Sequence, residues 1–118
     1  DKQFEPFLKA QRDWLFGRNP WGTSMFTKMP EGGEYPVEVH TVPYVLLDMQ
    51  VPGGLVDGPV YTSIYNNLLG LRLLKPDVFA QFQNEHVVYH DDVGDYSTNE
   101  PTMDGTAGSI LMMTHFSR

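Results

Sequence analysis

The chain has no cysteine, no surplus of basic residues and no long hydrophobic run among its 118 residues. Without cysteine it can form neither a disulfide framework nor a catalytic thiolate. Its net charge of −7 leaves no basic stripe to neutralise phosphates, which argues against a nucleic-acid-binding role. No apolar run approaches the roughly 20 residues of a membrane-spanning helix, so we expect no membrane span. The length suits one modest domain.

Aromatic residues, by contrast, are plentiful: two tryptophans, six tyrosines and seven phenylalanines. Much of this apolar surface must form a core, and the rest could stack against the flat faces of sugar rings. Trp21 follows an Asn-Pro turn, which favours a structural role for it. The chain begins at Asp1 rather than at a methionine, and we expect a piece of a longer protein.

The spacing of apolar residues predicts three helices. The first covers residues 2–16, the second runs from Pro59 to a stop before Pro76, and the third covers about 101–116. Residues 23–58 show no helical period and offer only short extended pieces. The predicted fold is therefore all-α, with about three helices joined by long ordered loops.

An acidic loop, residues 89–104, carries the strongest chemical signal in the chain. It holds five carboxylates: Asp91, Asp92, Asp95, Glu100 and Asp104. Glu100 stands just before Pro101, which suits the first position of a helix, so its carboxylate would meet the positive end of the helix dipole. To act as an acid near neutral pH it needs neighbouring carboxylates or burial, and the crowded loop offers both. The alternative is that these groups are only helix caps and solvated loop charges.

The sequence does not indicate a metal site, and we expect no cofactor. His86 and His90 are four residues apart beside two carboxylates, which on a helix would form a metal-binding face. The residues between them, Val87–Tyr89, favour a strand, which separates the two imidazoles. The acidic loop lacks the glycine and glutamate positions of an EF-hand, and only loose calcium binding by a longer parent protein is left open.

Three segments carry specific patterns. Residues 89–107 contain Tyr-x-Asp, then Tyr96, then Glu100-x-Thr and a final Thr-Ala. Residues 15–24 include Gly-x-Asn-Pro-x-Gly-x-Ser, and residues 54–59 read Gly-Leu-Val-Asp-Gly-Pro. Residues 89–107 resemble the C-terminal active-site signature of glycoside hydrolase family 9, the inverting cellulases. Residues 15–24 and 54–59 resemble two motifs that precede this signature in the family, and the three occur in the family's order. The matches span most of the chain, which makes them specific together.

The resemblance implies that residues 1–118 are the C-terminal part of a glycoside hydrolase catalytic domain, built as the end of an (α/α)6 barrel. It makes Glu100 the general acid of an enzyme that cleaves β-1,4-glucosidic bonds in cellulose-like β-glucans with inversion. It places His40, Tyr96 and Asp91 among the substrate-binding residues. The family's catalytic base lies in an Asp-x-Gly-Asp-type motif, which this chain lacks, so we expect the base elsewhere in a longer protein.

Without that base, and without the remainder of the catalytic domain as its partner, we expect the isolated chain to be inactive. We also expect it to associate into oligomers through its apolar stripes. A polysaccharide substrate implies a periplasmic or extracellular parent protein. The alternative interpretation is a non-catalytic carbohydrate-binding or assembly module, but such a module has no need of an acid at Glu100.

The chain departs from the family pattern at three positions. His40 fits the histidine of the family's His-x-Arg, but Val42 stands where the arginine is expected. Gly105 replaces a tyrosine, and Thr106 replaces an asparagine. The first two changes concern sugar contacts beside the scissile bond, so hydrolysis of β-glucans in general is a better expectation than activity on plain cellulose.

Overall fold

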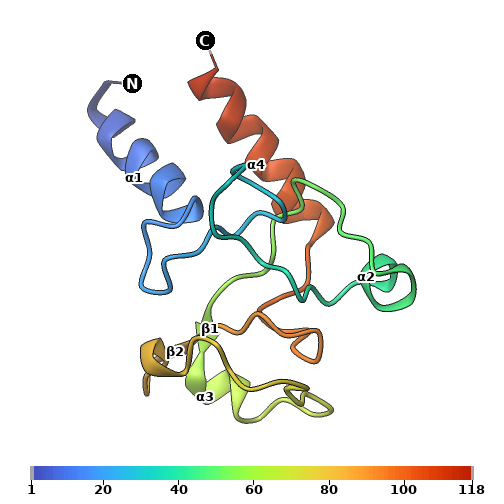
Figure 1. Cartoon of the computed structure of the whole chain (residues 1–118). Helices are drawn as coiled ribbons and strands as arrows, with labels where there is room; N and C mark the ends of the chain where they lie inside the picture. The colour runs from blue at the N-terminus through green and yellow to red at the C-terminus, as the bar shows by residue number, and fades with distance from the viewer. Residues whose placement is uncertain (1, 118) are drawn as a thin grey trace.

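The computed structural model describes residues 2–117 (Figure 1). Its elements, in chain order, are η1 (Lys2–Phe4), α1 (Glu5–Leu15), α2 (Val42–Leu47), β1 (Val60–Tyr61), α3 (Thr62–Tyr65), η2 (Ala80–Phe82), β2 (Val87–Val88) and α4 (Met103–Phe116). The helices α1 and α4 lie side by side at one end of the molecule, and the small sheet and α3 form the other end. Long loops connect the two ends and carry most of the acidic residues.

The expectation of an all-α fold is wrong. The described chain has four α-helices and a two-stranded antiparallel sheet, in which Val60–Tyr61 pairs with Val87–Val88. The error lies in the second predicted helix: its apolar stripe begins with a β-branched and an aromatic residue, which favour a strand, and only Thr62–Tyr65 is helical. Because the sheet stands where that helix was expected, the assignment to the end of an (α/α)6 barrel with about three helices is wrong as well.

The first and last predicted helices are confirmed. Pro6 lies in the first turn of α1, where its missing N–H costs no hydrogen bond. Gly17 follows the end of α1 with φ of 107°, a conformation that glycine adopts without strain. The helix α4 begins at Met103 rather than at Pro101, because Pro101 is held in an antiparallel bridge with Val56.

The short helix α2 occupies a stretch that the sequence predicted to be extended. Thr41 has an extended conformation and accepts a hydrogen bond from the backbone N–H of Tyr44 at 3.3 Å, so it caps the helix. Pro43 lies in the first turn, and Asp48 ends the helix in the left-handed conformation. Thr-Val-Pro is therefore a helix start, hidden in the sequence by the β-branched valines around the proline.

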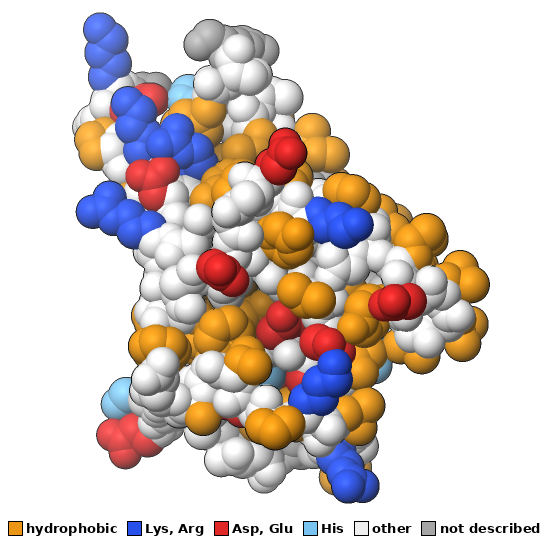
Figure 2. Space-filling view, viewed as in Figure 1, with side chains coloured by type: hydrophobic (Ala, Val, Ile, Leu, Met, Phe, Trp, Pro, Cys, Tyr) orange, Lys and Arg blue, Asp and Glu red, His pale blue; other side chains and the backbone are white. Residues whose placement is uncertain are grey.

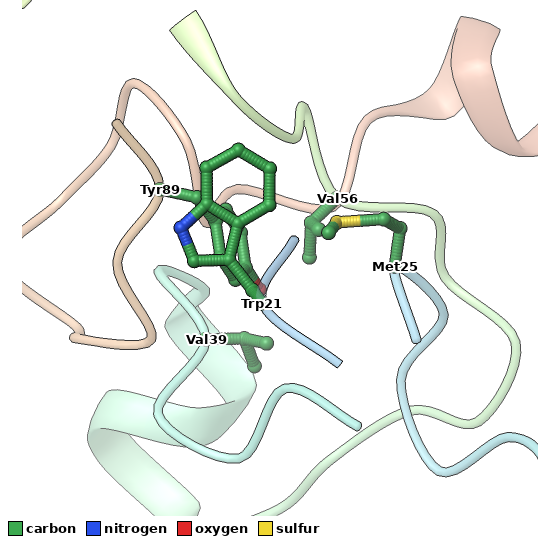
Figure 3. Close-up of a cluster of buried hydrophobic side chains, with 5 residues drawn as sticks. All are labelled: Trp21, Met25, Val39, Val56 and Tyr89. Atoms are coloured by element: carbon green, nitrogen blue, oxygen red, sulfur yellow. The ribbon is translucent and has the colours of Figure 1, made fainter. Parts of the chain in front are cut away.

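The core lies where the loops meet, and five residues form it: Trp21, Met25, Val39, Val56 and Tyr89 (Figure 3). Trp21 is 5% exposed and meets the Tyr89 ring edge-on, with 5.8 Å between the ring centroids. Its indole N–H donates to Gln83 Oε1 at 3.2 Å. None of the five belongs to a helix or a strand, and of the five only Val56 takes part in an isolated bridge. Packing between loops therefore fixes the position of the candidate site described below.

Large apolar side chains remain exposed on the helices. Leu46 and Leu47 on α2, and Ile110 and Leu111 on α4, are each more than half exposed. Figure 2 shows hydrophobic side chains gathered around α2, at the right of the view. Exposed apolar patches of this kind mark surfaces that associate with other protein, and oligomer formation by the isolated chain stays a prediction. Among the described residues, no helix is both long and apolar enough to cross a bilayer.

We predict that Trp21→Ala lowers the free energy of unfolding of the intact protein by about 3–5 kcal/mol, because it empties the centre of the core. Denaturant-induced unfolding followed by circular dichroism measures this loss. The control is Gln11→Ala at an exposed position of α1, which should change the free energy of unfolding by less than about 0.5 kcal/mol. Equal effects of the two substitutions would contradict the placement of the core.

Candidate active site

The acidic loop is held in shape by its own carboxylates. Asp95 is fully buried, and its Oδ1 accepts the backbone N–H groups of Ser97 at 2.8 Å and Thr98 at 3.0 Å, which closes a turn. Its Oδ2 accepts the Thr98 hydroxyl at 2.7 Å and the Nδ1–H of His90 at 2.8 Å. Four hydrogen bonds satisfy this carboxylate, so it serves the loop rather than a substrate.

Asp92 joins the acidic loop to a neighbouring loop. It accepts the backbone N–H groups of Leu74 at 3.0 Å, Lys75 at 2.9 Å and Gly94 at 2.7 Å. Burial disfavours its charge, but these donors outweigh burial and hold the pKa of Asp92 below its ordinary value. Glycine is required at position 94, because a Cβ there would lie 1.9 Å from the carbonyl oxygen of Arg72.

Asp91 and Asn99 hold a third loop against the acidic loop. Asp91 accepts the backbone N–H groups of Val37 and Glu38, each at 2.8 Å, and the side-chain amide of Asn99 at 3.0 Å. The backbone carbonyl of Asn99 accepts the N–H of His40 at 3.0 Å. Burial raises the pKa of Asp91, and the three donors to its carboxylate oppose that rise. These contacts bring His40 beside the acidic loop.

Glu100 is the exposed carboxylate at the end of this loop. No residue of the described chain donates a hydrogen bond to its carboxyl group. It lines an open pocket of about 530 Å³ together with His40, Thr41, Val42, Pro43, Val45 and Leu46. Because α4 begins at Met103, Glu100 lies ahead of the helix rather than at its mouth, and the helix dipole acts on it less than the sequence predicted.

His40 shares this pocket with Glu100. Its Nδ1–H donates to the Val93 carbonyl at 2.6 Å, which selects the tautomer and leaves Nε2 as an acceptor with no partner among residues 2–117. Tyr96 meets the His40 ring edge-on at 6.2 Å between centroids, and its hydroxyl donates to the Leu69 carbonyl at 2.9 Å. Tyr96 therefore contacts His40 but is not part of the pocket lining.

The structure thus brings two of the four predicted site residues, Glu100 and His40, into one pocket. Tyr96 and Asp91 lie one contact further away: Tyr96 against the His40 ring, and Asp91 against the backbone of the loop that carries His40. Their role in substrate binding stays a prediction: Tyr96 contacts the His40 ring and Asp91 contacts the loop ahead of it, and neither lines the pocket.

A residue near Glu100 was not among those predicted for the site. Asp57 belongs to the motif of residues 54–59 and lies in the loop ahead of β1. Its backbone N–H donates to the Glu100 carbonyl at 3.0 Å, and its side chain lies at the surface. Partial desolvation and the negative charge of Glu100 raise the pKa of Asp57 to about 6. The backbone contact between Asp57 and Glu100 joins residues far apart in the sequence, and no local pattern predicts it.

His86 and His90 do not form a joint site. His90 is buried, with Nδ1 on Asp95 and Nε2 at 3.7 Å from Asp77. His86 is exposed beside Glu85. Within the part of the chain that the structure describes, no group of three or more potential ligands is placed to hold a metal ion.

An exposed carboxyl group and an imidazole in one open pocket are the groups that hydrolases working by acid–base catalysis use. The chain belongs to glycosyl hydrolase family 9, because the model of that family matches residues 1–113. This match confirms the resemblance of the three sequence segments and places the chain among the glycoside hydrolases, whose substrates are carbohydrates. Searches for similar curated proteins and for similar solved structures gave no match.

We predict that Asp92→Asn lowers the free energy of unfolding of the intact protein by about 1–3 kcal/mol near neutral pH, because an amide replaces the charged acceptor of three backbone donors. The pKa of Asp92 is lowered in the folded state, so its contribution is complete above the ordinary value of 3.8 and is lost as the pH falls through the lowered value. The stability gap between wild type and variant should therefore narrow in acid.

Denaturant-induced unfolding at several pH values tests this prediction. The control is Glu85→Gln, an exposed position where the same kind of change should leave stability nearly unaltered at each pH. A gap between wild type and Asp92→Asn that stays constant from neutral pH into acid would show that the charge of Asp92 does not hold the loops together.

Proposed function

We propose that this chain supplies the general acid, Glu100, of an enzyme that cleaves β-1,4-glucosidic bonds in cellulose-like β-glucans with inversion. The observation that carries the proposal is the setting of the Glu100 carboxyl group. It is exposed in an open pocket beside His40, and no hydrogen bond from the described residues occupies it. The family match supports the class of reaction.

In the proposed reaction, the Glu100 carboxyl gives its proton to the glycosidic oxygen while the bond from that oxygen to the anomeric carbon breaks. A water molecule attacks the same carbon from the opposite face of the sugar ring and loses a proton to a base. The two carboxyl groups of an inverting enzyme stand about 6.5–9.5 Å apart, which leaves room for this water.

We infer that the base comes from outside residues 1–118. Asp91, Asp92 and Asp95 each accept at least three hydrogen bonds that hold loops together. Carboxylates held in this way cannot reach across a sugar ring, and Asp57 stands beside Glu100 rather than across the pocket from it. The chain is therefore proposed as the C-terminal part of a larger catalytic domain, which it needs for activity.

His40 is proposed to bind a sugar hydroxyl through Nε2, with its ring held by Tyr96 and its loop held by Asp91. Most of the remaining lining is aliphatic, and Val42, which stands in place of the family's arginine, is 69% exposed. An uncharged wall favours a neutral glucan over an anionic polysaccharide. Gly105 replaces a tyrosine in α4, where a Cβ would lie 2.7 Å from Thr102 Oγ1, so a larger side chain requires the Thr102 side chain to move.

A non-catalytic carbohydrate-binding module is the second candidate, and the pocket argues against it. Such a module needs flat aromatic side chains on which sugar rings stack, and the lining of this pocket contains no tryptophan, tyrosine or phenylalanine. A polymeric substrate also supports a periplasmic or extracellular location for the complete enzyme, because an intact polysaccharide does not enter the cell.

Glu100→Gln tests the acid directly, because it keeps the shape of the side chain and removes the proton. We predict that kcat of the complete enzyme on an unactivated β-glucan falls by at least about a hundredfold, the lower end of general acid catalysis. An aryl β-cellobioside with a good leaving group should lose less, because its leaving oxygen needs less protonation.

The melting temperature should not change, since Glu100 is exposed. Glu85→Gln is the control for the loss of one carboxylate. A Glu100→Gln variant that kept more than about a tenth of the wild-type kcat would refute the assignment.

The stereochemistry of the first product tests the mechanism separately. An inverting enzyme releases the α-anomer from a β-linked glucan, because water attacks the face opposite the leaving group. Proton NMR of the early reaction of the complete enzyme, before mutarotation, distinguishes the two anomers. A β-configured first product would mean retention and would remove the inverting mechanism while leaving Glu100 as a candidate acid.

A further inference from the structure

We propose that one side of α2 binds the flat face of a glucosyl residue beside the scissile bond. Val42, Val45 and Leu46 form this surface, which we call the α2 platform. The inference rests on the proposed function, because it takes the pocket of Glu100 as the substrate site. It assigns part of the binding to side chains that make no hydrogen bond to the sugar.

The α2 platform follows from the spacing of apolar residues in a short helix. Val42 is three residues from Val45 and four from Leu46, and side chains at these spacings are neighbours on the surface of a helix. Val42 is 69% exposed, Val45 60% and Leu46 73%. Figure 2 shows hydrophobic side chains gathered around α2. All three residues line the pocket that also holds His40 and Glu100.

The lining of this pocket divides into polar and apolar parts. The polar groups open to a ligand are His40 Nε2 and the Glu100 carboxyl, neither of which has a hydrogen-bond partner among residues 2–117. Thr41 instead caps α2 by accepting the backbone N–H of Tyr44. The side chains of the α2 platform offer no hydrogen-bond partner, so a hydroxyl buried against them would lose its water without replacement. The platform therefore suits a surface of C–H groups.

A β-glucosyl ring matches this division of the pocket. Its hydroxyl groups are equatorial, so they point outward from the rim of the ring, and its two flat faces carry only C–H groups. A ring laid on the α2 platform buries apolar surface on both partners. Its rim then remains free to place a hydroxyl at His40 and the glycosidic oxygen at Glu100. The pocket volume of about 530 Å³ lies within the usual range of small-ligand sites.

Val42 determines the character of the α2 platform. An arginine, which the family pattern has at this position, would place a charged hydrogen-bond donor in the pocket. Valine keeps the surface aliphatic. Aliphatic side chains bury less surface than the aromatic rings of a carbohydrate-binding module, so the platform orients one ring beside the acid and does not hold a polymer by itself.

The remainder of the catalytic domain is the other group that could cover the α2 platform. The location of the platform favours the sugar, because protein packed on Val42, Val45 and Leu46 would fill the pocket into which the Glu100 carboxyl opens. Leu47 is 69% exposed but does not line this pocket. Contacts of α2 with other protein are therefore expected at Leu47, with the platform left open to substrate.

The first experiment observes the α2 platform in the complete enzyme. Valine and leucine methyl groups are labelled with carbon-13, and NOEs are measured to a bound thio-linked β-1,4-gluco-oligosaccharide, which the enzyme cannot cleave. The three platform signals are assigned by their loss in Val42→Ile, Val45→Ile and Leu46→Ile. We expect NOEs from all three residues to hydrogens of one ring face. Val78, which is 68% exposed outside this pocket, should show none.

The second experiment compares two isosteric substitutions in the complete enzyme. Val42→Thr replaces a methyl group of the platform by a hydroxyl and should lower kcat/KM on a cello-oligosaccharide by about fourfold, the equivalent of one buried methyl group. The loss should appear mainly in KM, because the contact is made before and during the reaction alike. Val42→Ile keeps the surface apolar and should retain activity. Val78→Thr makes the same change at an equally exposed position and should leave KM unaltered.

The results separate failure of the α2 platform from failure of the proposed function. Sugar NOEs at the platform, together with a Glu100→Gln variant that stays active, would uphold the platform and remove Glu100 as the acid. An oligosaccharide that shifts other methyl signals but gives no NOE to the three platform residues would overturn the platform alone. A Val42→Thr variant that loses melting temperature without a change in KM would overturn it too, because α2 would then be covered by protein. An oligosaccharide that shifts no signal at all would overturn both proposals.

Discussion

The arrangement of the pocket depends on the carboxylate of Asp91. It accepts two consecutive backbone N–H groups from the loop that leads to His40, and the side-chain amide of Asn99. Hydrogen bonds to a charged acceptor contribute roughly 1.5–3 kcal/mol each, which is enough to fix loops that have no helix or sheet of their own. His40 follows the loop that Asp91 holds, and Glu100 follows Asn99. The Asp91 carboxylate therefore fixes the positions of His40 and Glu100 relative to each other.

The acidic residues therefore divide by burial into two groups with different tasks. Asp91, Asp92 and Asp95 are largely buried, and their carboxylates accept hydrogen bonds from backbone and side-chain donors. Glu100 and Asp57 are exposed, carry no such contacts among the described residues, and lie opposite each other across a bridge. The acidic loop thus uses three carboxylates to hold loops together and leaves the carboxyl group of Glu100 open to the pocket.

The sequence predicted the elements whose cause is local and missed those whose cause is not. The helices α1 and α4 follow from apolar spacing, proline and glycine. The second predicted helix is largely replaced by pairing of Val60–Tyr61 with a distant strand, which no local period reveals. The motif resemblance selected Glu100 and His40, and the structure brings them into one pocket, although their roles stay predictions. The backbone contact of Asp57 with Glu100 could not be found this way, because it comes from a register between segments far apart in the chain.

The central claim is that the pocket between His40 and Glu100 holds the scissile bond. The most direct test is a crystal structure of the complete protein with a thio-linked β-1,4-gluco-oligosaccharide, which the enzyme cannot cleave. Our account predicts that the sulfur at the scissile position lies within hydrogen-bond reach of a Glu100 carboxyl oxygen, and that a sugar hydroxyl donates to His40 Nε2. An oligosaccharide bound in a different cleft, with Glu100 out of reach of every inter-sugar linkage, would contradict it.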